Sequence, residues 1–161
     1  MKKPMSAKAI IKGSEKYPGI NGCAAFVTTD LGTMVTISVY GLPRKEGKCE
    51  CSIFAVHIHS GSTCTGDAAD PFKNAGSHYD KGDCPHPCHS GDMPSLYAYP
   101  SEGSDLSDRT DQAHMAFITN RFTPEDIIGR VIIIHTSPDD MHTQPSGNSG
   151  EKIACGEIVS M

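Results

Sequence analysis

The chain has 161 residues, and at this length one domain spanning residues 1–161 is the expectation. Its formal net charge of -5 disfavours nucleic acid and anionic membrane as partners, because both bind basic surfaces. No segment has the pattern of a signal peptide or of a membrane span, so we expect a cytoplasmic protein with no membrane partner.

In chain order, the sequence shows short apolar or alternating segments separated by turns. A single helical turn is expected after Thr123, a suitable N-cap, with Pro124 at the first helical position and Gly129 as terminator. About seven or eight short strands with little helix indicate an all-β sandwich or barrel. The expected strands cover residues 7–13, 21–28, 34–40, 52–59, 113–119, 130–136 and 152–159, with a shorter apolar segment at 93–99. Two long polar segments, 60–112 and 137–150, would carry function on this frame.

The most informative stretch is 55–92, which holds five of the eight histidines. His57 and His59 are two residues apart in a segment that alternates like a strand, so both side chains would point to the same face. On a helix the two rings would point in nearly opposite directions. We therefore expect a two-nitrogen clamp for a transition metal. The opposite, core-facing row would be Phe54, Val56 and Ile58.

A second set of ligand types follows within Cys84-Pro-His-Pro-Cys-His-Ser-Gly-Asp, at steps of three residues. Two histidines and a carboxylate, completed by one nearby histidine, make a tetrahedral set that suits zinc. The predicted members are His78, His86, His89 and Asp92.

The clamp gains a third candidate from the strand that ends at His135, which only folding can bring close. Three or four imidazoles in a tetragonal arrangement suit copper. The candidates for this second metal are His57, His59 and His135.

With these residues in view, the sequence from about Ala7 to Ile158 resembles the copper/zinc superoxide dismutases. A single His-x-His would be a weak signal, but several motifs occur here in the order typical of that family. They are Val56-His-Ile-His, Ala75-Gly-Ser-His-Tyr, His89-Ser-Gly-Asp, Ile128-Gly-Arg, His135 followed by Pro138-Asp-Asp, and Gly147-Asn-Ser-Gly-Glu-Lys-Ile-Ala-Cys-Gly.

The resemblance implies an eight-stranded Greek-key β-barrel, an immunoglobulin-like sandwich with two long functional loops, and a homodimer. It also implies a bridging imidazolate at His78, an intrachain disulfide between Cys64 and Cys155, and a carboxylate at Asp139 that hydrogen-bonds one histidine of each metal. Copper would be bound by His57, His59, His78 and His135, and zinc by His78, His86, His89 and Asp92.

The implied activity is antioxidant: superoxide is converted to dioxygen and hydrogen peroxide. This reaction needs a metal that cycles by one electron, which copper does and zinc does not. The ring of His78, once released from copper, could take up a proton. Because the substrate is an anion and the protein is net negative, a local cation must guide it, and alignment with the family gives this role to Lys152.

Two features depart from the family pattern. Lys152 stands where the family usually has arginine, so we expect steering to persist and anion docking to be looser. The segment between His86 and His89 is several residues shorter than in the familiar animal enzymes. Cys84 and Cys88 flank His86, and they could be free, joined in a disulfide, or bound to zinc through one thiolate.

Three other cysteines, Cys23, Cys49 and Cys51, are expected to be free and mostly buried. As an alternative function, the domain could store or deliver copper without turnover. A dedicated delivery protein should also carry a Met-x-Cys-x-x-Cys domain, and the sequence has none. A purely structural zinc domain would leave the other three histidines, His57, His59 and His135, unexplained.

Overall fold

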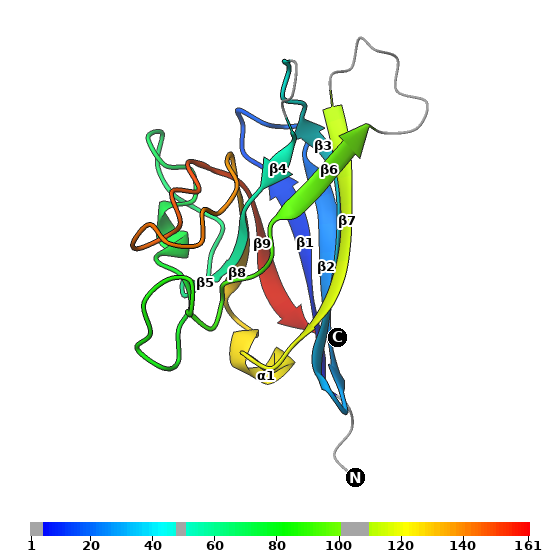
Figure 1. The fold of residues 1–161 in the computed structure, drawn as a ribbon, viewed down its shortest axis with the longest axis vertical. Helices are drawn as coiled ribbons and strands as arrows, with labels where there is room; N and C mark the ends of the chain where they lie inside the picture. Colours follow the sequence, from blue (N-terminus) through cyan, green and yellow to red (C-terminus); the bar gives the residue numbers. More distant parts are fainter. Residues whose placement is uncertain (1–4, 48–50, 101–109) are drawn as a thin grey trace.

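The computed structural model describes residues 5–47, 51–100 and 110–161. Nine strands form one antiparallel sheet in these ranges, together with one short α-helix and one 3-10 turn (Figure 1). The strands are β1 (Ser6–Gly13), β2 (Asn21–Thr29), β3 (Gly32–Pro43), β4 (Ile53–Phe54), β5 (Val56–His59), β6 (Leu96–Pro100), β7 (Thr110–Thr119), β8 (Val131–His135) and β9 (Lys152–Ser160). The helical elements are η1 (Lys73–Ala75) and α1 (Pro124–Ile127).

The sheet closes on itself because its two end strands are consecutive in the chain. The strand order is β4-β6-β7-β3-β2-β1-β9-β8-β5, and only Ala55 separates β4 from β5. The pairings of β3 with β7 and of β1 with β9 join strands that are distant in sequence, as in a Greek key. The predicted eight-stranded Greek-key barrel is confirmed, except that the strand expected over 52–59 is split into β4 and β5, which makes nine.

The barrel interior is filled by the inward row of each strand. Phe54, Val56 and Ile58 are fully buried in the main core, as the alternation predicted. Phe26 and Phe122 meet edge to face in the same core, with ring centroids 6.1 Å apart. This packing fixes the face of β5 that the two histidines occupy.

Strand β8 is buried on both faces, which explains its unbroken β-branched sequence. Ile132 and Ile134 belong to the barrel core. Val131 and Ile133 lie on the outer face of the same strand, where they form a second cluster with Phe72, Ala75 and Cys155. The loop that follows β5 is therefore seated on the outside of the barrel by its own apolar contacts.

The helical turn predicted after Thr123 is present as α1. The Thr123 side chain accepts a hydrogen bond from the Asp126 N–H, and the Asp126 side chain accepts one from the Thr123 N–H. Gly129 follows with a φ of +81°, a conformation that favours glycine. This turn carries the chain from β7 across to β8.

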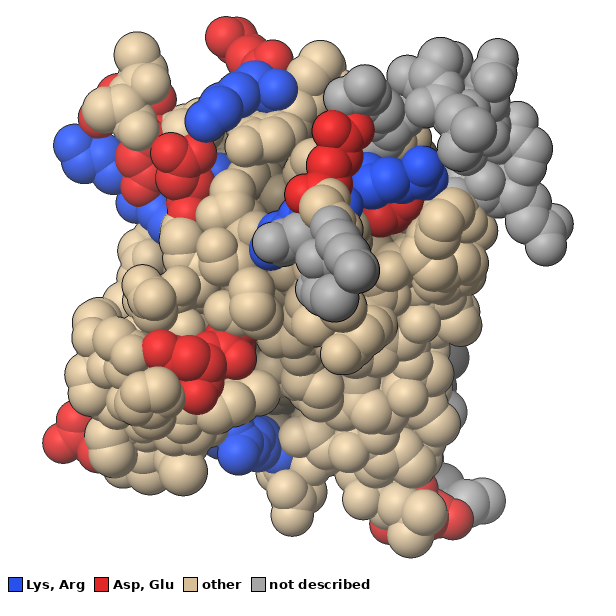
Figure 2. Space-filling model, turned by 45° about the horizontal axis from the view of Figure 1, so that its top comes forward, with Lys and Arg blue, Asp and Glu red and all other residues tan. Residues whose placement is uncertain are grey.

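On the face shown in Figure 2, Lys and Arg lie close to Asp and Glu. Such mixing gives an anion no broad basic field on this face, so attraction must come from local groups. Within the described ranges, no helix has both the length and the apolar character that a membrane crossing requires.

Candidate metal centre

The histidines gather on the outer side of the barrel, beneath two long loops. His57 and His59 point away from the core, yet they are only 0% and 3% exposed because residues 60–95 and 136–151 cover them. In Figure 1 these loops lie together beside β5 and β8. Isolated bridges pair His59 with His78 and His57 with Asp92, so the first loop is hydrogen-bonded alongside β5.

The first group of possible ligands combines β5, β8 and the first loop. Its ligand atoms all lie within 4.8 Å of one another, and all its residues are buried. The Nε2 atoms of His59 and His135 are 3.3 Å apart. The two side chains approach each other from opposite ends of the β5–β8 pairing, in which His59 lies opposite Val131. The members are His57, His59, His78 and His135.

The second group shares one ring with the first. Asp92 is its centre, with Oδ1 2.7 Å from Nδ1 of His78, and Oδ2 3.0 Å from Nδ1 of His86 and 3.3 Å from Nδ1 of His89. These ligand atoms also lie within 4.8 Å of one another. The shared residue is His78.

Four buried nitrogens show that the two groups suit metal ions. They make no hydrogen bond, although two of them lie within ion-pair distance of Asp92. A buried polar atom without a hydrogen bond is costly. A metal ion at each group would satisfy all four. They are His57 Nδ1, His78 Nε2, His86 Nδ1 and His89 Nδ1.

The opposite nitrogens of several rings are held by oxygen atoms. Asp139 reaches both groups, with Oδ2 2.8 Å from His57 Nε2 and Oδ1 2.9 Å from His86 Nε2. His59 Nδ1 lies 2.8 Å from the carbonyl of Gly76. Such partners fix which nitrogen carries the proton and leave the other one free for a metal. The carboxylate is where the resemblance places it.

Gly147 makes room for this carboxylate. A Cβ at this position would lie 2.0 Å from Asp139 Oδ1 and 2.7 Å from His86 Nε2, and the φ of Gly147 is +69°. Any larger residue would displace the carboxylate that links the two groups.

Three of the buried rings, those of His57, His59 and His135, have lowered pKa values in the metal-free protein. Burial lowers the pKa of His57 to about 2 and that of His135 to about 4, and nearby His78 acts in the same direction. Burial also holds the pKa of His59 well below its usual value. A neutral imidazole is the form that binds a metal, so these sites need not lose a proton near neutral pH.

Lys152 lines the same pocket as His59, His78 and His135. Its Nζ lies 2.5 Å from Asp70 Oδ2 and donates to the carbonyl of Phe72 at 3.3 Å. The lysine side chain is 18% exposed. The cation therefore stands at the pocket wall, with its charge partly neutralised by Asp70.

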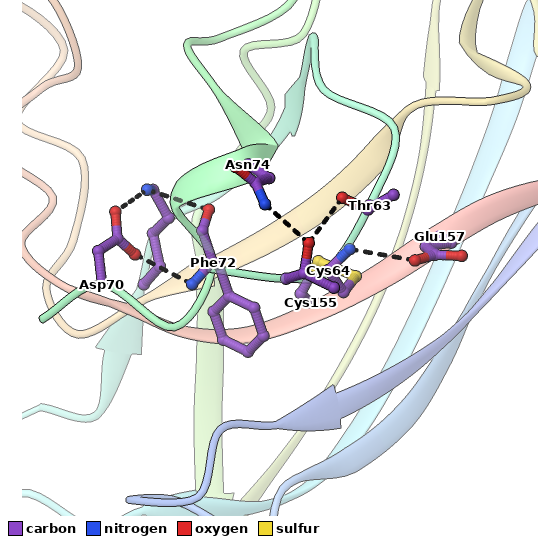
Figure 3. Close-up of a disulfide and its surroundings, with 9 residues drawn as sticks. Thr63, Cys64, Asp70, Phe72, Asn74, Cys155 and Glu157 are labelled. Atoms are coloured by element: carbon purple, nitrogen blue, oxygen red, sulfur yellow. Dashed lines mark hydrogen bonds and ion pairs between the residues drawn. A yellow bond between two sulfur atoms is a disulfide. The ribbon is translucent and has the colours of Figure 1, made fainter. Parts of the chain in front are cut away.

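The disulfide between Cys64 and Cys155 is formed, which confirms this prediction. It ties the loop after β5 to β9 across 91 residues of sequence. Figure 3 shows Asp70 and Phe72, the two residues that contact Lys152, on the same loop as this bridge. The bridge thus anchors one wall of the pocket.

The other described cysteines are free thiols. Of the three alternatives for Cys84 and Cys88, the structure has the free one: both are exposed, and neither belongs to a ligand group. Cys23 and Cys51 are free as expected, but the expectation of burial is wrong because both are exposed. Cys23 lies on the outward row of β2, opposite Ile10. Cys49 falls outside the described residues.

Three residues that hold site residues in place were not predicted from the sequence. They are Asp70, Arg121 and Gln144. Asp70 pairs with Lys152, while Arg121 and Gln144 donate hydrogen bonds to backbone carbonyls around His86. A polar residue in a polar loop carries no signal of such a contact.

The family model described as copper/zinc superoxide dismutase matches residues 20–158. A copper–zinc superoxide dismutase of Deinococcus radiodurans is 36% identical over 154 residues, covering 85% of this chain and 76% of the relative. Another, from Ramazzottius varieornatus, is 31% identical, and the match covers 96% of this chain and 80% of the relative. A third, from Caulobacter vibrioides, is 30% identical, and the match covers 95% of this chain and 85% of the relative.

Proposed function

Because the chain belongs to the copper/zinc superoxide dismutase family, we propose that it converts superoxide to dioxygen and hydrogen peroxide. The observation that supports this most directly is the pair of four-residue ligand groups joined at His78, with four buried nitrogens that make no hydrogen bond. Two ions held on either side of one ring fit the chemistry of a copper and zinc enzyme.

In this proposal, each group takes the metal that its donors favour. All-nitrogen coordination suits copper, and three nitrogens with one carboxylate suit zinc. Bound copper would supply the reversible one-electron step, which zinc cannot. Copper would be held by His57, His59, His78 and His135, and zinc by His78, His86, His89 and Asp92.

The protein's own part in the reaction centres on His78. Its Nδ1 faces the zinc group, 2.7 Å from Asp92, so this side of the ring is fixed. Its Nε2 is buried and has no hydrogen-bond partner, and the ring belongs to the copper group as well. Nε2 is therefore the atom at which this chain can hold a proton for the peroxide product. The loops that cover the ring keep bulk water away from it.

Guidance of superoxide falls to Lys152 in this proposal. With the whole chain at -5, a distant anion is repelled, and a cation at the pocket wall must reverse this locally. Lys152 lines the pocket beside His59 and His135, and its pairing with Asp70 weakens the attraction without removing it.

A loading experiment tests the assignment. The purified chain is reconstituted with copper and zinc, its metal content is measured, and superoxide removal is followed by pulse radiolysis. We expect His135→Ala to abolish turnover while zinc content stays at one ion per chain. Full activity in this variant would refute the copper assignment. A chain that binds both ions and removes no superoxide would instead be the copper-storage alternative.

We also propose that the chain forms a homodimer through the outward faces of β2, β1 and β9. Three apolar side chains on this surface are largely exposed: Ile10 at 59%, Val159 at 49% and Met161 at 60%. Sedimentation should give twice the 17.2 kDa chain mass, and Ile10→Lys should yield monomers. A monomeric parent protein would contradict this proposal. The cytoplasmic location expected from the sequence stays a prediction.

A further inference from the structure

The segment 84–92 carries three of the four residues proposed to bind zinc, yet it lies outside the strands and helices. Ligands on such a segment must be held in place by contacts from elsewhere, or binding must order the segment at a cost in free energy. Asp80 holds part of the segment by accepting hydrogen bonds from the N–H groups of Cys84 and Ser90. Two side chains from more distant parts of the sequence hold the backbone around the histidines.

Gln144 makes two hydrogen bonds with the backbone of His86. Its Nε2 donates to the His86 carbonyl at 2.6 Å, and its Oε1 accepts from the His86 N–H at 3.1 Å. The two residues are 58 positions apart in sequence. Asp139, which lies in the same loop as Gln144, has its Oδ1 2.9 Å from His86 Nε2. Together these contacts fix both the main chain and the ring of His86, whose Nδ1 lies 3.0 Å from Asp92 Oδ2 in the zinc group.

Arg121 contacts the backbone of the rest of the segment, from Pro87 to Asp92. It follows the end of β7, and one terminal nitrogen, Nη1, lies near three carbonyl oxygens of the segment. The distances are 2.8 Å to Pro87, 3.3 Å to His89 and 3.5 Å to Asp92. One guanidinium group thus donates to carbonyl oxygens that would otherwise need water or a regular secondary structure as their hydrogen-bond donor.

We propose that Gln144 and Arg121 are positioning residues that hold segment 84–92 in its zinc-binding shape before the ion arrives. This inference rests on the proposed zinc site. Neither side chain contacts the ion; each acts through the backbone that carries the ligands. The two side chains add to the hydrogen bonds that Asp80 makes with Cys84 and Ser90, and they act on the part of the backbone that carries the histidines.

Zinc release provides the test. Gln144→Met and Arg121→Met keep side-chain bulk and remove the hydrogen bonds. Each should lose zinc to a chelator about 10- to 100-fold faster than the parent, as for other groups that support metal ligands. The visible spectrum of cobalt bound in place of zinc should also shift. Arg121→Lys should restore most of the retention, because it keeps a donor.

Gln112→Met is the matched control, since this residue lies near the start of β7, at the other end from Arg121. It should behave like the parent. If Gln144→Met fails to fold, Gln144→Glu decides, because it keeps the acceptor for the His86 N–H and lacks the donor to the His86 carbonyl. It should then release zinc faster than the parent, and a parent-like rate would count against the role of Gln144.

Parent-like zinc release and cobalt spectra in both methionine variants would overturn the inference. Failure of the zinc site itself would look different: His89→Ala would then leave the zinc content of the parent unchanged. If zinc retention depended on His89 but not on Gln144 or Arg121, the zinc site would stand and only the positioning role would be refuted.

Discussion

Reduction of the bridge between Cys64 and Cys155 should lower the melting temperature strongly. The cysteines are 91 residues apart, so the bridge closes more than half of the chain into a loop. In the chain-entropy model, a loop of this length restricts the unfolded chain by about 4.6 kcal/mol at 25 °C. For a protein of this size, about 1 kcal/mol shifts the melting temperature by about 2–4 °C, so a fall of about 9–18 °C is expected.

Calorimetry on the metal-free chain, with and without reductant, measures this fall directly. Reduction removes no heavy atom from the chain and adds only two thiol hydrogens, so the change reports the cross-link and not the loss of a side chain. The exposed thiol of Cys23 provides the control, because Cys23→Ser should leave both melting temperatures unchanged. Oxidised and reduced forms that melt within about 2 °C of each other would show that the bridge does not restrict the unfolded chain as this model requires.

The remaining predictions concern charge, protonation and capping. Asp70→Asn should free the charge of Lys152 and raise kcat/KM for superoxide about two- to fivefold at low ionic strength, with a steeper salt dependence; a decrease would show that Asp70 is needed to place the lysine. In the metal-free protein, urea unfolding should show stability falling as the pH drops from 6.5 towards 4. Over this range the unfolded chain takes up a proton at His135, while the folded chain, with a pKa of about 4, does not. The loss from this residue is about 3 kcal/mol, and a flat profile would contradict its burial as a neutral ring. Thr123→Ala should cost about 1 kcal/mol in the same assay, whereas Thr123→Ser should cost little.

The sequence predicted those features that depend on neighbours along the chain. The alternation around His57 and His59 identified both the core face and the ligand face of β5, because the period of a strand is local. The cap at Thr123 is likewise contained within four residues.

Features that depend on distant pairing were not predictable in this way. β2 is apolar on both faces, so the pattern could not tell that Cys23 points outward. The contacts of Gln144 with His86 and of Asp70 with Lys152 join residues 58 and 82 positions apart. Nothing in the local sequence distinguishes these side chains from solvated loop residues.

The single carboxylate of Asp139 has a consequence for how the two ions would be acquired. One of its oxygens orients His57 and the other orients His86, so the two rings cannot be adjusted independently. An ion that fixes either ring also fixes the carboxylate, and thereby prepares the second ring. Occupancy of the two sites should then be cooperative, and by thermodynamic linkage the effect is reciprocal: zinc tightens copper binding by the same factor that copper tightens zinc binding.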